Sequence, residues 1–153
     1  MTEEKKTFVN LKHARTQEQI DVMTQIEKDG VCPFCMENFL KYHPKPILDE
    51  NENWVVTENM SPYEGTVHHF LFVCKRHFTM PNGMKDEEKK SLFDLINVMI
   101  SKNEIIGGSI LIRFGDMDYN GASVDHFHAH LIVGETNDGQ REKIKVKVGF
   151  QKA

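Results

Sequence analysis

Residues 125–133 read Asp-His-Phe-His-Ala-His-Leu-Ile-Val, and this stretch decides the fold. Histidines occupy three alternate positions, with apolar residues between and after them. On a β-strand, alternate side chains point to opposite faces of the sheet, so His126, His128 and His130 would share one face while Phe127 enters the core. On a helix the same three histidines would spread over about 200°. The pattern therefore predicts a strand with a histidine-lined face.

Three evenly spaced imidazoles are hard to obtain from a structural need alone and favour chemistry. Imidazole can act as a nucleophile or as a metal ligand near neutral pH, so the residues leave both kinds of site open. A single zinc ion held by all three histidines is the least favoured arrangement. Same-face residues of one strand lie about 6.5–7 Å apart, which demands a wide reach from the ligands.

The composition narrows the class of protein. The chain has 153 residues, enough for one domain with a proper core, and its net charge is −4 with histidine neutral. That balance predicts no broad attraction to nucleic acid. No apolar run is long enough to span a membrane, so we expect no membrane partner and a cytoplasmic location. Three cysteines fit a reducing compartment better than a disulfide framework.

Local signals predict three helices. Thr16 can cap a helix over residues 17–29, with Gly30 as its stop, and residues 36–42 can form a short second helix. Asp86 can cap a third helix. We expect residues 1–15 to be a flexible N-terminus and residues 16–153 to form a single domain. The third helix would bury a stripe at helical spacing, made of Leu92, Leu95, Ile96 and Met99.

The remaining segments predict an antiparallel sheet. Residues 115–123 are rich in Gly, Asp and Asn and predict a loop leading into the histidine strand. Lysines alternate with apolar residues over 143–148, where a solvated lysine face is expected and an anionic ligand is the alternative. Interspersed helices and strands with short connections predict an α+β fold with an antiparallel sheet covered by helices. Besides the histidine stretch, strands are expected over residues 54–58, 68–74, 109–114 and 144–148.

The pair Cys32-Pro33-Phe34-Cys35 has two common interpretations, a metal knuckle and a redox dithiol. A redox pair normally follows a buried strand, whereas a helix and Gly30 precede this one. Histidines that could complete a zinc site occur elsewhere, and His77 stands at a strand end from which it can reach a neighbouring loop. The residues therefore favour zinc, with a thiol oxidoreductase as the alternative.

The motifs together resemble those of the histidine triad (HIT) superfamily. Residues 126–132 match its His-φ-His-φ-His-φ-φ signature, where φ is apolar. Residues 121–124 are similar to its Gly-Gln-Ser/Thr-Val approach, and residues 69–77 to its His-φ-φ-φ-φ-Pro-Lys-x-His segment. The cysteine pair resembles that of the zinc-containing branch. The matches run from residue 32 to residue 134 in the expected order.

The resemblance implies a HIT-like fold with a mainly five-stranded antiparallel sheet, often in a homodimer paired across the long helix. It implies a nucleotide hydrolase or nucleotidyl transferase that acts at an α-phosphate through a nucleotidyl-histidine intermediate. The substrate would be a dinucleoside polyphosphate or a nucleoside phosphoramidate. A dinucleoside polyphosphate phosphorylase, or a zinc-stabilised nucleotide-binding or interaction protein with little turnover, is the alternative.

Carried onto this sequence, the resemblance makes His128 the nucleophile and gives His130 a hydrogen bond to the phosphate or leaving group. His69 becomes a supporting partner behind them. A structural zinc ion would be held by Cys32, Cys35, His77 and His126. Nucleotide and phosphate contacts would come from Asn59, Asn120, Gly121, Ser123, Val124 and His130.

The sequence also departs from the family pattern. Ala122 occupies the position of a phosphate-contacting Gln, and Gly115 that of an Asn or Gln that often meets the leaving group. Cys74 replaces a proline, and residues 133–135 lack the Pro-Arg that follows the triad in the diadenosine polyphosphate hydrolases. These departures leave the substrate open.

Overall fold

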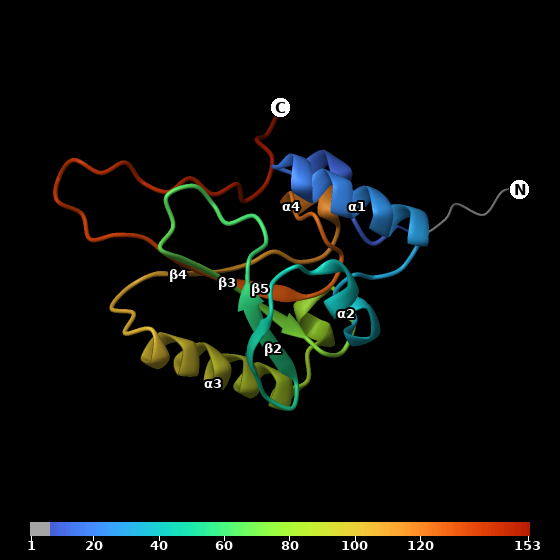
Figure 1. The fold of residues 1–153 in the computed structure, drawn as a ribbon, viewed down its shortest axis with the longest axis horizontal. Helices are drawn as coiled ribbons and strands as arrows, with labels where there is room; N and C mark the ends of the chain where they lie inside the picture. The colour runs from blue at the N-terminus through green and yellow to red at the C-terminus, as the bar shows by residue number, and fades with distance from the viewer. Residues whose placement is uncertain (1–6) are drawn as a thin grey trace, which may run out of the picture.

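A five-stranded antiparallel sheet lies at the centre of the computed structural model, which describes residues 7–153 (Figure 1). Its spatial order is β1-β2-β3-β5-β4, and each neighbouring pair is antiparallel. The expected α+β class and five-stranded sheet are thereby confirmed. The strands are β1 (Ile47–Glu50), β2 (Trp54–Glu58), β3 (His68–Cys74), β4 (Ser109–Ile112) and β5 (His128–Val133).

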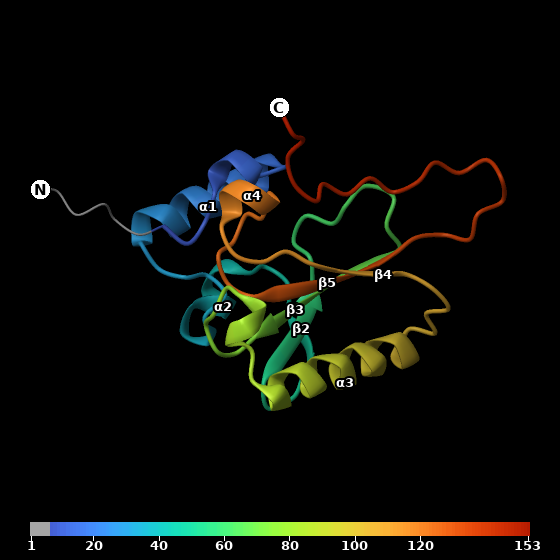
Figure 2. The same cartoon turned by 180° about the vertical axis from the view of Figure 1, so that it is seen from behind.

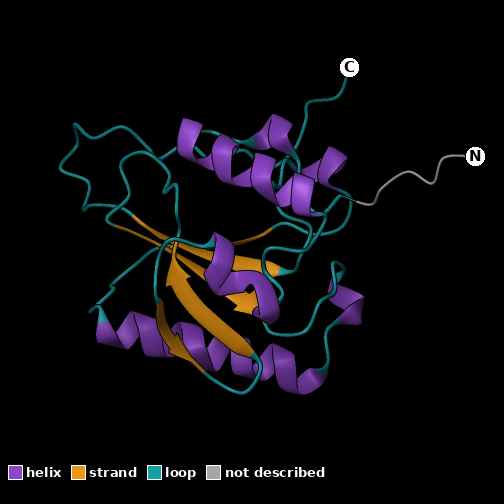
Figure 3. Ribbon diagram, turned by 45° about the vertical axis from the view of Figure 1, so that its right-hand side comes forward, coloured by secondary structure: helices purple, strands orange, loops and turns teal. Residues whose placement is uncertain are grey.

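Helices cover both faces of the sheet, with α3 on one side and α1 and α2 on the other (Figures 2 and 3). The first helix has the predicted bounds because its capping signals work: the Thr16 hydroxyl accepts the N–H of Gln19 at 3.1 Å, and Gly30 ends it at φ 68°. The helices are α1 (Gln17–Asp29), α2 (Met36–Tyr42), α3 (Asp86–Lys102) and α4 (Met117–Asn120), with 3-10 turns at Leu11–His13 and Pro81–Gly83.

The larger core lies between α3 and the sheet. The indole nitrogen of Trp54 donates to the carbonyl of Glu88 at 2.8 Å, which satisfies the one polar atom of a fully buried ring. The predicted apolar stripe of α3 packs against the face of the sheet formed by every second side chain of β2, β3 and β5. This core includes Leu92, Leu95, Ile96 and Met99 from α3, and Phe72, Ala129 and Leu131 from the sheet.

The alternation in β5 works as predicted. Phe127, Ala129 and Leu131 belong to the α3 core, so the histidines between them face the opposite layer. That layer holds a second buried cluster, in which Phe34 and Phe39 pack against Leu71 of β3. The histidine face thus lies on the side of α1 and α2.

Several local predictions are wrong. Lys85, not Asp86, is the N-cap of α3, and its backbone N–H is held by the Glu88 carboxylate at 2.8 Å. Residues 144–148 make no strand, because the segment has no hydrogen-bonding partner strand. The strand predicted over 109–114 ends at Ile112. The predicted loop 115–123 contains the short helix α4, and β1 was not predicted.

Of the expected flexible N-terminus, residues 1–6 lie outside the described residues. Val9 is buried and pairs with Val124 in an isolated antiparallel bridge. The division into a flexible terminus and one domain stays a prediction. Within residues 7–153, no helix has the length and apolar character needed to span a membrane.

Candidate active site and metal centre

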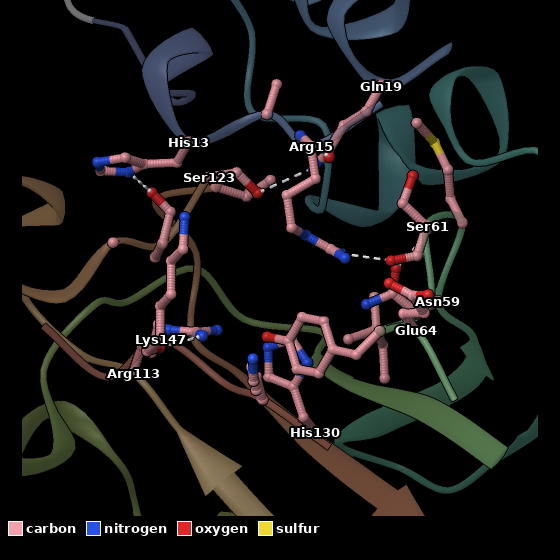
Figure 4. Close-up of a pocket in the computed structure, with 18 of the residues that line it drawn as sticks. His13, Arg15, Gln19, Asn59, Ser61, Glu64, Arg113, Ser123, His130 and Lys147 are labelled. Carbon is pink, nitrogen blue, oxygen red and sulfur yellow. Dashed lines mark hydrogen bonds between the residues drawn. The ribbon is translucent and has the colours of Figure 1, made fainter. Parts of the chain in front are cut away.

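A pocket of about 1320 Å³ lies on the histidine face, between the sheet, the N-terminal segment and the C-terminal segment (Figure 4). His128 and His130 form part of its floor. Arg15 and Asn59 lie on one side of it and Arg113 on the other, as Figure 4 shows for the labelled side chains.

The tautomer of His128 is fixed by the backbone carbonyl of His126. Its Nδ1 lies 2.6 Å from the carbonyl oxygen of His126, and a carbonyl can only accept, so Nδ1 carries the proton. The lone pair is therefore on Nε2. Burial lowers the pKa of His128 to about 4, which leaves the ring neutral at pH 7. The structure thus provides an uncharged imidazole with a free lone pair in the pocket.

The tautomer of His130 is fixed through His69. The backbone N–H of Tyr63 donates to His69 Nδ1 at 3.1 Å, so the proton of neutral His69 is on Nε2. That Nε2 lies 2.8 Å from His130 Nδ1 and 3.1 Å from Asn59 Nδ2. An amide NH2 cannot accept, so the His69 proton is donated to His130 Nδ1, which leaves the His130 proton on its own Nε2. His130 Nε2 is buried and has no hydrogen-bond partner among the described residues. His130 Nε2–H is therefore a buried donor whose acceptor would have to come from a ligand.

The sheet register explains why these two histidines meet. Leu71 of β3 is directly opposite His130 of β5, so His69, two residues earlier, is the diagonal neighbour on the same face. Burial lowers the pKa of His69 to about 4, with repulsion from Arg15 and Arg113 adding to the effect. Burial also lowers the pKa of His130 well below its ordinary value. Both rings are therefore neutral at pH 7.

Two arginines flank the histidine pair. The Arg15 guanidinium lies 4.6 Å from the centre of the Tyr63 ring and donates to the carbonyl of Ser61. The Arg113 Nη2 donates to the carbonyl of Lys147 at 2.6 Å, while its buried Nε has no partner among the described residues. Together they make the pocket suitable for an anion.

The expected nucleotide-binding residues fall into two groups. Asn59, Gly121, Ser123 and Val124 line the pocket together with His130. Asn120 does not line it, because its amide is turned back into the loop, where Nδ2 donates to the carbonyl of Phe114 and Oδ1 accepts from the N–H of Ala122.

Sequence reasoning missed the contributions of the N-terminal segment and of the chain after β4. Arg15 lies just before α1 and Gln19 in its first turn, and the Gln19 amide nitrogen lies 3.4 Å from Ser123 Oγ. Gln19 thus places a glutamine amide beside Ser123, although position 122 carries alanine. Arg113 follows β4 directly. In the sequence, Arg113 is distinguished only as a single cationic residue after the apolar residues 110–112.

The four predicted metal ligands meet beside the pocket. Cys32, Cys35, His77 and His126 each bring one donor atom, and all four atoms lie within 4.8 Å of one another. The Sγ of Cys32 is 3.3 Å from His126 Nδ1, the Sγ of Cys35 is 3.5 Å from His77 Nδ1, and the two Nδ1 atoms are 3.1 Å apart. Zn–S near 2.3 Å and Zn–N near 2.0–2.1 Å at tetrahedral angles give S···N of about 3.6 Å and N···N of about 3.4 Å. The spacing fits a tetrahedral zinc ion.

The surroundings of His126 support the same fit. Its Nε2 lies 2.6 Å from the carbonyl of Cys74 and donates to it, so Nδ1 directs its lone pair into the cluster. Burial raises the pKa of Cys32 to about 12, so only a bound cation would stabilise its thiolate there. Two cysteine thiols and two imidazoles converging on one point are the donor set of a structural zinc site.

Solved structures share the fold. A histidine triad protein from Clostridium difficile is 20% identical over 72% of this chain and 96% of its own, with a TM-score of 0.55. A histidine triad nucleotide-binding protein from Candida albicans is 17% identical over 76% of this chain and 87% of its own, with a TM-score of 0.57. A zinc-bound histidine triad family protein from Mycobacterium smegmatis is 18% identical over 74% of this chain and 82% of its own, with a TM-score of 0.55.

The fold and the arrangement of His126, His128 and His130 define a protein of the histidine triad superfamily, as the sequence motifs predicted. Within it, residues 32–146 match the family described as "Scavenger mRNA decapping enzyme C-term binding", and the chain belongs to that family. At the level of the family, these similarities support a nucleotide hydrolase. The comparison with curated proteins gives no match.

Proposed function

We propose that this protein cleaves a nucleotide at its α-phosphate through a covalent nucleotidyl-histidine intermediate on His128. The substrate class is a dinucleoside polyphosphate or a nucleoside phosphoramidate. The observation that carries the proposal is the opposite protonation of the two pocket histidines. A lone pair on His128 Nε2 and an N–H on His130 Nε2 stand on one face of one strand.

These two groups suit the two demands of phosphoryl chemistry. His128 Nε2 attacks the α-phosphorus, the N–P bond forms, and the bond from phosphorus to the leaving group breaks with its electron pair going to that group. A phosphate leaves as an anion, and an amine leaves after taking a proton from solvent. The His130 N–H donates a hydrogen bond to a phosphate oxygen, where negative charge accumulates in the transition state. Water then attacks phosphorus and releases a proton to solvent, the P–N bond breaks, and the nucleoside monophosphate leaves with His128 restored.

The cationic side chains support the same assignment. Arg15 and Arg113 lie on opposite sides of the pocket, and their charge adds to burial in lowering the pKa of His69 and His130. A phosphate between them would receive charge-assisted hydrogen bonds from planar donors. Ser123 and Asn59 line the same pocket. The Ser123 hydroxyl lies 3.4 Å from the Gln19 amide nitrogen and the Asn59 Oδ1 accepts from the Ser61 N–H at 2.8 Å, and we assign these two residues to the phosphate and to the nucleoside.

We propose zinc at the four-ligand cluster, with a structural role. Four protein ligands close the coordination shell and leave no position for substrate. The cysteine loop also carries Phe34, whose ring lies edge-on to His128 with centroids 5.1 Å apart. Zinc at this site would thus hold the loop that buries the nucleophile.

A nucleotide-binding protein with little turnover is the second candidate. Ala122, where the family pattern has a phosphate-contacting Gln, favours it. A homodimer and a cytoplasmic location remain predictions from the resemblance and the composition.

Rapid-quench mass spectrometry with diadenosine triphosphate and with adenosine 5′-phosphoramidate tests the mechanism. Wild type should carry an adenylyl adduct on His128 during turnover. His128→Ala should form no adduct and lose turnover, yet bind AMP. Turnover without an adduct would overturn the covalent route, and AMP binding with neither adduct nor turnover would favour the second candidate.

A further inference from the structure

The C-terminal strap, residues 141–150, closes the open side of the pocket without being part of the sheet. It is anchored at three points. Ile144 packs against Gly134, where an added Cβ would lie 2.9 Å from its Cδ1. The Lys147 carbonyl accepts from Arg113 at 2.6 Å, and the Phe150 ring contacts His13 with centroids 5.9 Å apart. The strap therefore has a defined path along the pocket.

The strap directs its charge into the pocket. Alternation keeps Ile144 and Val146 half-buried, while Lys143, Lys145 and Lys147 are exposed and line the pocket. The expected solvated lysine face is thus a wall of the candidate active site. In Figure 4, Lys147 and Arg113 lie on the side of the pocket away from Arg15 and Asn59.

The side chains that line the pocket carry a net positive charge, whereas the whole chain is negative. Among the described residues, seven Lys and Arg side chains and three Glu side chains line the pocket, whereas the whole chain has a net charge of −4. The acidic side chains are Glu64, Glu135 and Glu142. A cationic surplus gathered at one pocket of an acidic protein concentrates anions there.

One more donor beside the strap has no role within the protein. Arg113 Nε is buried and unpartnered among the described residues, although the same guanidinium holds the strap through Nη2. A buried donor without a partner costs free energy unless a ligand satisfies it. It lies on the strap side of the pocket, apart from Arg15.

We propose that the strap lysines, with Arg113, form a leaving-group subsite that selects substrates carrying further phosphates beyond the α-phosphate. The subsite binds the anionic leaving group while His128 engages the α-phosphorus, and this assignment rests on the proposed function. It disfavours phosphoramidates, whose leaving group is an uncharged or cationic amine. Lys143, Lys145 and Lys147 are therefore specificity-determining residues of the pocket.

The test compares two triple variants. Lys143→Gln, Lys145→Gln and Lys147→Gln together remove the charges of the strap. The matched control replaces three exposed lysines of α3 by glutamine, which removes the same charge far from the pocket; these are Lys89, Lys90 and Lys102.

We expect the strap variant to lower kcat/KM for diadenosine triphosphate by roughly tenfold or more, since charge-assisted contacts are lost, and to leave the value for adenosine 5′-phosphoramidate within about threefold. Its kcat/KM for the triphosphate should also depend less on salt than that of wild type. The α3 control should match wild type with both substrates. An equal fall for both substrates, no fall for either, or the same fall in the α3 control would overturn the subsite.

A binding measurement separates this proposal from the proposed function. Calorimetric titration with AMP and with a methylene-bridged diadenosine triphosphate analogue needs no turnover. Wild type should bind the analogue more tightly than AMP, and the strap variant should lose that preference. If wild type cleaves neither substrate but shows this pattern, the mechanism fails while the subsite stands. If the preference is absent from wild type or persists in the strap variant, the subsite fails.

Discussion

Replacing His69 gives the sharpest test of how the pocket sets the protonation of its histidines. In His69→Ala the Nε2–H that donates to His130 Nδ1 at 2.8 Å is lost, and the buried Nδ1 has no donor. Leaving it unsatisfied costs about 1–3 kcal/mol. The cost falls if the His130 proton moves to Nδ1, but Nε2 then becomes an acceptor facing the phosphate.

The expected effect on catalysis follows from that reversal. Loss of one well-placed donor to transition-state charge costs about 2.7–4 kcal/mol, which is a fall in kcat of about 100- to 1000-fold. KM should change little, because the interaction strengthens only as the charge develops. Single-turnover kinetics with diadenosine triphosphate measures the chemical step directly.

His69→Gln is the matched control, because glutamine keeps an N–H donor at the end of its side chain. It should recover much of the rate. Nitrogen-15 NMR of the imidazoles reports the tautomer of His130 independently of turnover: Nε2–H in wild type and in His69→Gln, Nδ1–H in His69→Ala. Wild-type kcat in His69→Ala, or a Gln variant as slow as the Ala variant with an unchanged His130 tautomer, would refute the reasoning.

Three further predictions concern metal, pH and association. Wild type purified without chelator should contain about one zinc per chain and Cys35→Ser much less, by elemental analysis, with a lower melting temperature for the variant; a metal-free, fully folded wild type with a reversible Cys32–Cys35 disulfide would contradict this. The pKa of His69 is about 4 in the folded protein and 6.5 ordinarily, so between these values the unfolded chain binds more protons than the folded chain. The contribution of His69 to the free energy of unfolding is therefore fully present above pH 6.5 and is lost as the pH falls toward 4. At pH 5 this one group removes about 2 kcal/mol relative to pH 8, and urea unfolding should show a shallower pH dependence in His69→Gln than in wild type. Phe93 of α3 is half-exposed, so light scattering should find a dimer that Phe93→Glu weakens; a wild-type monomer at high micromolar concentration would rule this out.

Much of the fold was readable from local patterns. Thr16 and Gly30 fix the ends of α1 by capping, which depends on neighbours in the sequence alone. The alternation around His128 assigns each residue of β5 to a face, since side-chain direction in a strand has a period of two. The four metal ligands were identified by their chemistry and by the family motif, and their donor atoms do converge.

The strand expected over 144–148 failed for a physical reason. Alternation indicates an extended segment, but a strand also needs a partner, and none is offered to these residues. The lysines are exposed, as expected for a solvated face, and they also line the pocket. Conversely, β1 reads Ile-Leu-Asp-Glu without strict alternation and is a strand because β2 pairs with it.

Local sequence patterns predicted which histidines share one face of β5 and which side chains could hold a metal. The surroundings of those side chains depend on tertiary packing. Arg15 and Lys147 are far apart along the chain, yet they line one pocket with His130 because the segment before α1 and the strap both reach the histidine face. The tautomer of His130 depends on the diagonal register of β3 against β5 and on the backbone of Tyr63. Protonation and local charge are set by atoms close in space, and closeness in space is what the packing of distant segments creates.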